Sequence, residues 1–300
     1  MPIKIATAQY PIRYHASWDA WKNYMEQWIR EATEKQAALL LFPEYGAMEL
    51  VSIFPTDVQQ DIQRQLQELQ TIYPAFCRFF GEMADRYSVI ICAPSFPVTA
   101  GQQIYNRTHV FAPKGHTGFQ DKFFMTRFED ETWGIHTPPK VLTLFDAGWC
   151  RFGVQTCYDV EFALGARWLC EAGAELILAP SCTETLRGAT RVHVGARARA
   201  LENQCYTAVS QTVGEALWSP AVDINFGYAA VYTTPDQDFP EEGILLSGEP
   251  QAEQWLFAEL DFDKIKNVRE NGQVLNFRSH ASLSYQYREE EVLLQTVRLY

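Results

Sequence analysis

The stretch FGVQTCYDVEFALGARWLCEAGAELILAPS, residues 152–181, contains the pattern that decides the fold. The residues from Phe152 to Thr156 alternate in type, as in a half-buried strand, and Cys157 stands where the apolar pattern stops. A helix is predicted over about 161–172, and the apolar run AELILAP at 174–180 predicts a second strand. A strand, a helix and a strand in this order indicate a layered α/β domain with helices outside and sheets inside.

The same alternation extends along the rest of the chain. A helix is predicted to begin after Ser17, which caps it, and to carry a core-facing stripe that includes Trp21 and Met25. Further helices are predicted over about 57–86 and 191–204, and further strands over 3–9, 37–44, 88–96, 205–212, 226–233, 243–247 and 254–261, with strand pairs in 104–123 and 141–157. No repeat or linker divides the chain, so a single domain is predicted over 1–280. The polar and charged segment 281–300 is interpreted as a C-terminal extension that packs on a partner subunit.

Composition and charge exclude several classes of protein. The 300 residues are 47% hydrophobic and 14% aromatic, which is ample for a core and argues against disorder. A net charge of −12 argues against nucleic acid as a partner. The longest apolar runs, such as 37–43, are too short to cross a bilayer, and no secretory signal is recognisable at the N-terminus. A cytoplasmic protein without a membrane partner is therefore expected.

The number and spacing of the cysteines and histidines predict neither disulfides nor a metal site. The seven cysteines are odd in number and include no C-x-x-C pair, so reduced thiols are expected. The six histidines are scattered, and none has the H-x-x-x-H spacing of a zinc site, so no metal is expected. Most of the cysteines are interpreted as small core residues.

Three predicted strands end in a residue able to do chemistry. LLLFPE ends in Glu44, GFQDK in Lys122 and FGVQTC in Cys157, and reactive groups of layered α/β domains gather where strands end. In such a set the thiolate attacks a carbonyl carbon, the carboxylate takes the thiol proton, and the ammonium stabilises the oxyanion. Each residue also has an alternative interpretation when it is considered alone. Glu44 could cap a loop, Lys122 could be a solvated side chain, and Cys157 could be a core residue.

The segments that hold these residues closely resemble the three signature segments of the nitrilase superfamily, the carbon–nitrogen hydrolases. They are LLLFPEYGAMEL (39–50), FQDKFFMTRFEDE (119–131) and the stretch at 152–181. Supporting similarities are IATAQY (5–10), YNRTHVFAPKG (105–115), ARARALENQCY (196–206) and FDKIKNVREN (262–271). The resemblance extends over roughly residues 3 to 272.

This resemblance implies a four-layer α-β-β-α sandwich that dimerises and often assembles further, so a homodimer or larger homo-oligomer is expected. The glutamate base, the lysine and the nucleophile of the family fall on Glu44, Lys122 and Cys157. A second glutamate, which follows the lysine by seven residues in several members, falls on Glu129. The backbone N–H after the nucleophile, here that of Tyr158, is expected to complete the oxyanion site.

Four further residues carry expectations about the surroundings of the site. Arg167 is expected to pair with a nearby carboxylate, and Asp159 is expected to orient the loop of the nucleophile. Many members carry an aromatic residue after the strand LILAPS, whereas this chain has Glu184 in that region. Glu184 at the pocket mouth would favour a positively charged substrate, and its alternative is a solvated loop carboxylate. Trp133 either faces the substrate or packs in the core.

The resemblance implies a hydrolase that cleaves a non-peptide carbon–nitrogen bond of a small amide through a cysteine thioester. Ammonia or an amine would be released, and neither a metal nor an organic cofactor is required. The alternatives are a nitrilase, an acyl transferase that uses an amine or a lipid, and an inactive binding protein on the same fold. Tyr158 directly after Cys157 resembles the amidases, whereas nitrilases of the superfamily more often carry tryptophan there. A papain-like pair of Cys157 with His193 or His109 is the weakest alternative, because no local signature surrounds either histidine.

Overall fold

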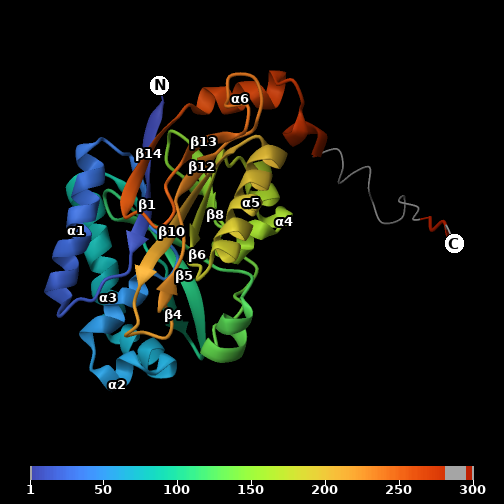
Figure 1. Cartoon of the computed structure of the whole chain (residues 1–300). Helices are drawn as coiled ribbons and strands as arrows, with labels where there is room; N and C mark the ends of the chain where they lie inside the picture. Colours follow the sequence, from blue (N-terminus) through green and yellow to red (C-terminus); the bar gives the residue numbers. More distant parts are fainter. Residues whose placement is uncertain (1, 281–294, 299–300) are drawn as a thin grey trace.

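Helices form the two outer layers of the molecule, and strands lie between them (Figure 1). One outer layer contains α1 (Trp18–Glu34) and α3 (Ile62–Tyr87). The opposite layer contains α4 (Ala163–Glu171) and α5 (Leu186–Asn203). Helix α6 (Phe262–Asn271) follows the strand that ends at Leu260.

The strands form two half-sheets. The first contains β1 (Ile3–Pro11), β2 (Leu39–Leu41), β3 (Ile90–Cys92), β4 (Phe96–Ala100), β5 (Gln103–Ala112), β6 (His116–Asp121) and β14 (Gln254–Leu260). The second contains β7 (Phe145–Asp146), β8 (Arg151–Val154), β9 (Leu176–Ser181), β10 (Tyr206–Glu215), β11 (Ile224–Asn225), β12 (Ala230–Tyr232) and β13 (Ile244–Ser247).

Strand β1 is the seam between the two half-sheets. It runs parallel to β2 and antiparallel to β14, and Ile3 lies opposite Leu260. At its end β1 runs parallel to β10, where Gln9 lies opposite Gln211. The first half-sheet therefore continues into the second through a single strand.

Successive side chains of a strand point to opposite faces of the sheet, so the apolar residues of one strand pack in different clusters. Leu39 and Leu41 of β2 lie in a cluster with Leu176 of β9, so this cluster fills the space between the half-sheets. Leu40 points the other way and lies in the cluster that includes residues of α1 and α3. In the same manner Ile177 of β9 packs in a cluster with residues of α4. Because apolar residues fill each space between successive layers, the fold is the predicted four-layer α-β-β-α sandwich.

Helix α1 forms where its sequence predicts it. The Ser17 side chain accepts a hydrogen bond from the Ala20 N–H at 3.1 Å and so caps the helix. Trp21, Met25 and Ile29 recur at helical spacing and are fully buried. Truncation of the Trp21 ring to alanine would cost about 3–5 kcal/mol of stability, the typical range for such a core change.

The structure corrects several predicted boundaries. Strand β2 covers only Leu39–Leu41 of the predicted 37–44, and Pro43, which has no N–H to donate, lies just beyond its end. Segment 141–144 is not a strand. The Thr143 N–H donates to the side-chain oxygen of Gln120, and the Thr143 hydroxyl donates to the carbonyl oxygen of Phe119, so Thr143 does not pair with a neighbouring strand. Helix α5 begins at Leu186, five residues earlier than predicted, because Thr185 caps it by accepting from the Gly188 N–H.

Short helical turns that were not predicted follow β2 and β6. They are η1 (Gly46–Ile53) and the π-helical turn η2 (Phe128–Trp133). The helix predicted over about 57–86 is divided into the short helix α2 (Thr56–Gln59) and the long helix α3. A further 3-10 turn, η3 (Cys157–Glu161), follows β8.

The structure describes residues 2–280 and 295–298. In this part of the chain no helix has both the length and the apolar character needed to span a membrane. The predicted packing of segment 281–300 on a partner concerns residues that lie mainly outside the described ranges, so it stays a prediction.

Candidate active site

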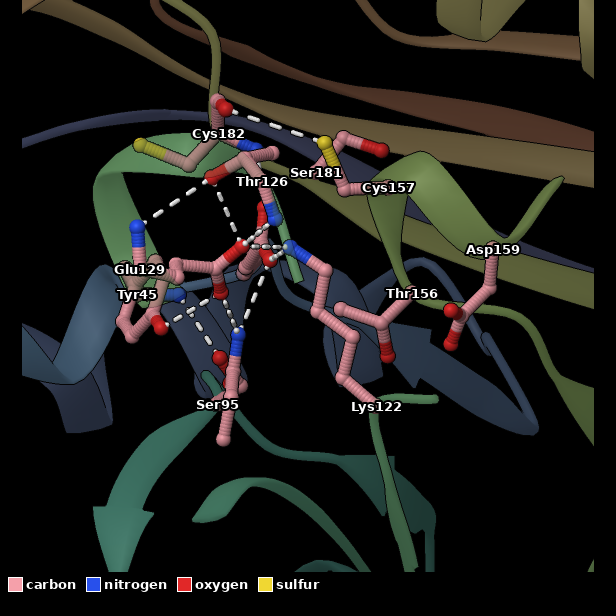
Figure 2. A network of polar contacts seen from close by, with 12 residues as sticks. Tyr45, Ser95, Lys122, Thr126, Glu129, Thr156, Cys157, Asp159, Ser181 and Cys182 are labelled. Atoms are coloured by element: carbon pink, nitrogen blue, oxygen red, sulfur yellow. Dashed lines mark hydrogen bonds and ion pairs between the residues drawn. The ribbon is translucent and has the colours of Figure 1, made fainter. Parts of the chain in front are cut away.

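Four loops that follow strands meet at one edge of the sandwich. Glu44 follows β2, Lys122 directly follows β6, Cys157 follows β8 and Cys182 follows β9. Figure 2 shows the Lys122 side chain reaching toward Glu129, while the Cys157 sulfur faces the backbone of Cys182. The predicted residues Glu44, Lys122, Glu129 and Cys157 therefore line one cavity.

The Lys122 ammonium lies between two carboxylates. Its Nζ donates to Oε1 of Glu44 at 2.8 Å and to Oε2 of Glu129 at 2.6 Å, and its side chain is 1% exposed. Burial lowers the pKa of Lys122, but the charges of Glu129 and Glu44 outweigh burial and hold the pKa well above its usual value. Lys122 is therefore a fixed positive charge at neutral pH.

Glu44 is the carboxylate nearest to the backbone of Cys182. Its Oε2 accepts from the Cys182 N–H at 3.0 Å, and its Oε1 accepts from Nδ2 of Asn106 at 2.9 Å. Burial raises the pKa of Glu44, and the charge of Lys122 only partly opposes this effect. A carboxylate with a raised pKa is a stronger base than an ordinary glutamate.

Glu129 has the opposite environment. Its Oε1 accepts from the Tyr45 hydroxyl at 2.7 Å, and its Oε2 accepts from the N–H and the hydroxyl of Thr126, each at 2.9 Å. Burial raises the pKa of Glu129, but Lys122 and these hydrogen bonds outweigh burial and hold the pKa below its usual value. Two carboxylates on one ammonium therefore differ in basicity, with Glu44 the more basic and Glu129 the more firmly held.

Cys157 begins a tight turn directly behind strand β8. Its φ of 49° is in the left-handed region, which is uncommon for residues other than glycine and recurs at functional sites. Its Sγ lies 3.8 Å from the carbonyl oxygen of Cys182. Burial and the charge of Glu44 raise the pKa of the Cys157 thiol well above its usual value, although Lys122 opposes them. The sulfur is therefore a protonated thiol at neutral pH and needs a base.

Helix α5 holds this turn in place. The Arg199 guanidinium donates to the carbonyl oxygen of Val160 at 3.0 Å. A Cβ added at Gly195 would lie 2.8 Å from the same carbonyl oxygen, so the close approach of helix and turn requires glycine. The nucleophile turn thus rests on a rigid helix.

Asp159 connects this turn to the loop after Lys122. Its carboxylate accepts from the Phe123 N–H at 3.0 Å and from the Phe124 N–H at 2.8 Å. Burial raises the pKa of Asp159 to about 7, while Lys122 and these backbone hydrogen bonds oppose the rise. The geometry agrees with the expectation that Asp159 orients the loop of Cys157.

The cavity has a volume of about 240 Å³. Trp133 and Glu184, for each of which substrate binding is one of two expected roles, are among its lining residues. Trp133 also packs edge-on against Tyr45, with ring centroids 5.0 Å apart, so it lines the cavity and packs at once. Tyr158 is not a lining residue, and its ring packs against Phe162. Only its backbone N–H remains a candidate for the oxyanion site.

The histidines named as alternatives have other neighbours. His193 lies 3.0 Å from Oε1 of Gln211 and 2.8 Å from the hydroxyl of Tyr232. His109 lies 2.7 Å from the hydroxyl of Tyr73. Among the described residues neither histidine contacts Cys157, which removes the papain-like alternative.

Arg167 forms the expected ion pair. Its Nε donates to Oε1 of Glu171 at 2.8 Å. In residues 2–280 and 295–298 no three His, Cys, Asp or Glu side chains are grouped so that they could hold a metal ion.

Sequence reasoning missed the groups that hold the glutamates. Asn106 donates from Nδ2 to Glu44 and also to Glu129, the latter at 3.2 Å. Tyr45 and Thr126 bind Glu129, as described above. A polar residue at a buried position of a strand, as in YNRTHVFA, is the signal that could have identified Asn106.

Comparisons with known proteins agree with this arrangement. The carbon–nitrogen hydrolase family model matches residues 4–270. A probable hydrolase of Bacillus subtilis (strain 168), YhcX, is 29% identical over 273 residues, which cover 91% of this chain and 52% of that protein. The chain thus spans about half the length of this relative. The omega-amidase NIT2 of Bos taurus is 25% identical over 254 residues, which cover 81% of this chain and 83% of that protein.

A solved structure has a similar fold. The crystal structure of Saccharomyces cerevisiae Nit3, a member of branch 10 of the nitrilase superfamily, superposes with a TM-score of 0.70 and 23% identity. The superposition covers 90% of this chain and 93% of that one.

Proposed function

The chain belongs to the carbon–nitrogen hydrolase family, and we propose that it hydrolyses a small amide through a thioester on Cys157. The observation that carries the proposal is the contact set of Lys122, which binds both Glu44 and Glu129 in the cavity of Cys157. An amidase and a hydrolase among the relatives support the same class of reaction.

The first half of the reaction forms the thioester. Glu44 takes the proton of the Cys157 thiol, whose raised pKa makes such a base necessary. The sulfur attacks the amide carbon, and the Lys122 ammonium and the Tyr158 N–H stabilise the resulting oxyanion. Glu44 then returns the proton to the leaving nitrogen, so that the carbon–nitrogen bond breaks and ammonia or an amine departs.

The second half of the reaction releases the acid. Glu44 removes a proton from a water molecule, which attacks the thioester carbon. The carbon–sulfur bond then breaks, and the sulfur regains its proton from Glu44. Glu129 acts in both halves by positioning Lys122, because its lowered pKa keeps it an anion throughout.

An inactive binding protein on the same fold is the less favoured possibility. It would not need a charged lysine held between two carboxylates of different basicity. Such buried charges are costly to desolvate, and functional sites are where they typically persist.

The test is ammonia release from a panel of short primary amides, combined with intact-protein mass spectrometry. The proposal requires turnover of at least one amide and a mass increase equal to its acyl group on Cys157. The Cys157→Ala variant should show neither. Turnover that persists in this variant would contradict the proposal.

A further inference from the structure

The charges around the cavity are unevenly balanced. Three carboxylates line it, those of Glu44, Glu129 and Glu184, against one ammonium. That ammonium, Lys122, already binds both Glu44 and Glu129. No other lysine or arginine is among the described residues that line the cavity. A substrate carboxylate would therefore meet repulsion without a free cation to bind.

Glu184 is held near the nucleophile by the loop that carries it. It follows Cys182 by two residues, and Cys182 contacts both Glu44 and Cys157 through its backbone. Two residues of extended chain span at most about 7 Å. The backbone of Glu184 is therefore close enough to the reacting sulfur for a substrate with a short aliphatic chain to reach both.

The residue between them, Thr183, is pinned to a neighbouring segment. Its carbonyl oxygen accepts from the Phe226 N–H at 2.7 Å, and its hydroxyl donates to the Phe226 carbonyl oxygen at 2.7 Å. These reciprocal bonds hold the loop of Glu184 against the segment that contains Asp223 and Ile224. The backbone of Glu184 is thus held at the cavity by the fold, and the Glu184 side chain is exposed to solvent.

The carboxylate of Glu184 has no basic partner among the residues that the structure describes. In the described part of the chain Glu184 takes part in no ion pair, whereas many other carboxylates do. Burial and the charge of Asp223 raise the pKa of Glu184. A ligand cation would relieve the repulsion between these two carboxylates.

The lining of the cavity is partly apolar. Trp133, Phe128, Ala221 and Ile224 line it, and methylene groups would pack on such side chains. The cavity of about 240 Å³ limits the substrate to a small molecule.

We propose that the substrate is a small aliphatic amide whose far end carries an ammonium group, and that Glu184 binds this group. This inference rests on the proposed amide hydrolysis and names its substrate class. Glu184 acts here as a specificity-determining residue, while Glu44, Lys122 and Cys157 act on the amide.

Three amides of equal length test the proposal. 5-Aminopentanamide ends in an ammonium group, hexanamide in a methyl group and adipamic acid in a carboxylate. We expect kcat/KM for 5-aminopentanamide to exceed that for hexanamide about tenfold and to exceed that for adipamic acid further, as expected for a charge pair at a partly solvated site.

The variant Glu184→Gln should lower kcat/KM for 5-aminopentanamide about tenfold and leave that for hexanamide within twofold. The control variant Glu259→Gln removes the same charge from the exposed side of β14, where Glu259 pairs with Lys4, and should change neither value. Added salt should lower the preference for the cation in the wild type only.

The outcomes separate the two proposals. Equal or larger kcat/KM for adipamic acid, or equal losses for both substrates in Glu184→Gln, would overturn the substrate class while the hydrolysis stands. Absence of ammonia release and of Cys157 acylation with all three amides would contradict the hydrolysis and the substrate class together.

Discussion

The carboxylate of Asp159 accepts a hydrogen bond from the backbone N–H of Phe124 at 2.8 Å. It also accepts from the N–H of Phe123, the residue directly after Lys122. Asp159 itself lies two residues after Cys157 in the turn η3. This contact therefore ties the backbone of the proposed nucleophile to that of the lysine.

Replacement of Asp159 tests this positioning role. Asp159→Asn turns an NH2 group toward backbone N–H donors, so at least one of the hydrogen bonds is lost. We expect kcat to fall roughly 10- to 100-fold, because small displacements of reacting groups have effects of this size. Alkylation of Cys157 by iodoacetamide should continue. Asp146→Asn, at an exposed carboxylate that pairs with Arg151, is the control and should keep full activity. An unchanged kcat in Asp159→Asn would refute the role.

The raised pKa of Asp159 also predicts a pH dependence of stability. Its pKa is about 7 in the folded protein and near 3.8 when unperturbed, so the folded state binds this proton more tightly. The stabilisation is full below pH 3.8 and is lost as the pH rises through 7. The free energy of unfolding of the wild type, relative to that of Asp159→Asn, should fall over this interval by a few kcal/mol, at about 1.4 kcal/mol per pKa unit. Urea unfolding of both proteins at several pH values measures this difference, and a constant difference would contradict the prediction.

Two cysteines of the cavity should respond differently to truncation. Cys157→Ala should reduce turnover by several orders of magnitude and leave the melting temperature nearly unchanged, because it removes the proposed nucleophile from the cavity wall. Cys182→Ala should keep most of the activity, because Cys182 contacts Glu44 and Cys157 through its backbone. Ammonia release and thermal melts of both variants provide the measurement. A larger loss in Cys182→Ala would reverse the assignment.

The two glutamates should also separate in the covalent step. Glu44→Gln removes the proposed base, so acylation of Cys157 should stop. Glu129→Gln weakens the hold on Lys122, so turnover should slow while an acyl adduct still forms. Intact-protein mass spectra after mixing with substrate distinguish the variants. Rapid and complete acylation of Glu44→Gln would show that another group takes the thiol proton.

We expect amides to be preferred over matched nitriles. Attack on an amide places an anionic oxygen at once beside Lys122 and the Tyr158 N–H, and such donors contribute roughly 3 kcal/mol each. A nitrile gives a thioimidate, which must take up water before ammonia leaves. The ratio of kcat/KM for each amide and nitrile pair, from ammonia release, decides the question. A consistent preference for nitriles would indicate a nitrilase with the same catalytic residues.

The layers of the fold could be predicted from the sequence, and so could the grouping of the candidate residues Glu44, Lys122 and Cys157 around one cavity, in part from strand ends and in part from the resemblance to the carbon–nitrogen hydrolases. Leu39 to Leu41 form a buried run, as expected for a covered strand, and Glu44, Lys122 and Cys157 each come after a strand. Their spacing along the chain reflects strand ends that meet in space, so a linear pattern could predict a shared site.

Other parts of the site have no such pattern. Cys182 acts through its N–H and carbonyl oxygen, which every residue except proline has, so its side chain carries no signal. The early start of α5 depends on the cap at Thr185, and the left-handed turn at Cys157 depends on packing against Gly195. The turn at Cys157 is decided by contacts between segments far apart in sequence, which a local pattern does not contain. The cap at Thr185 is a contact over three residues, so it is a local signal that the prediction overlooked.

The seam strand also has a consequence for synthesis on the ribosome. β1 leaves the exit tunnel well before β10 and β14, yet Gln9 pairs with Gln211 and Ile3 with Leu260. At typical translation speeds β14 emerges on the order of ten seconds or more after β1. During this interval the nascent chain exposes the edges of β1 and the apolar faces beside it, which favours engagement by chaperones. The thiol and its base can be brought to their final distance only when nearly all of the domain has been translated.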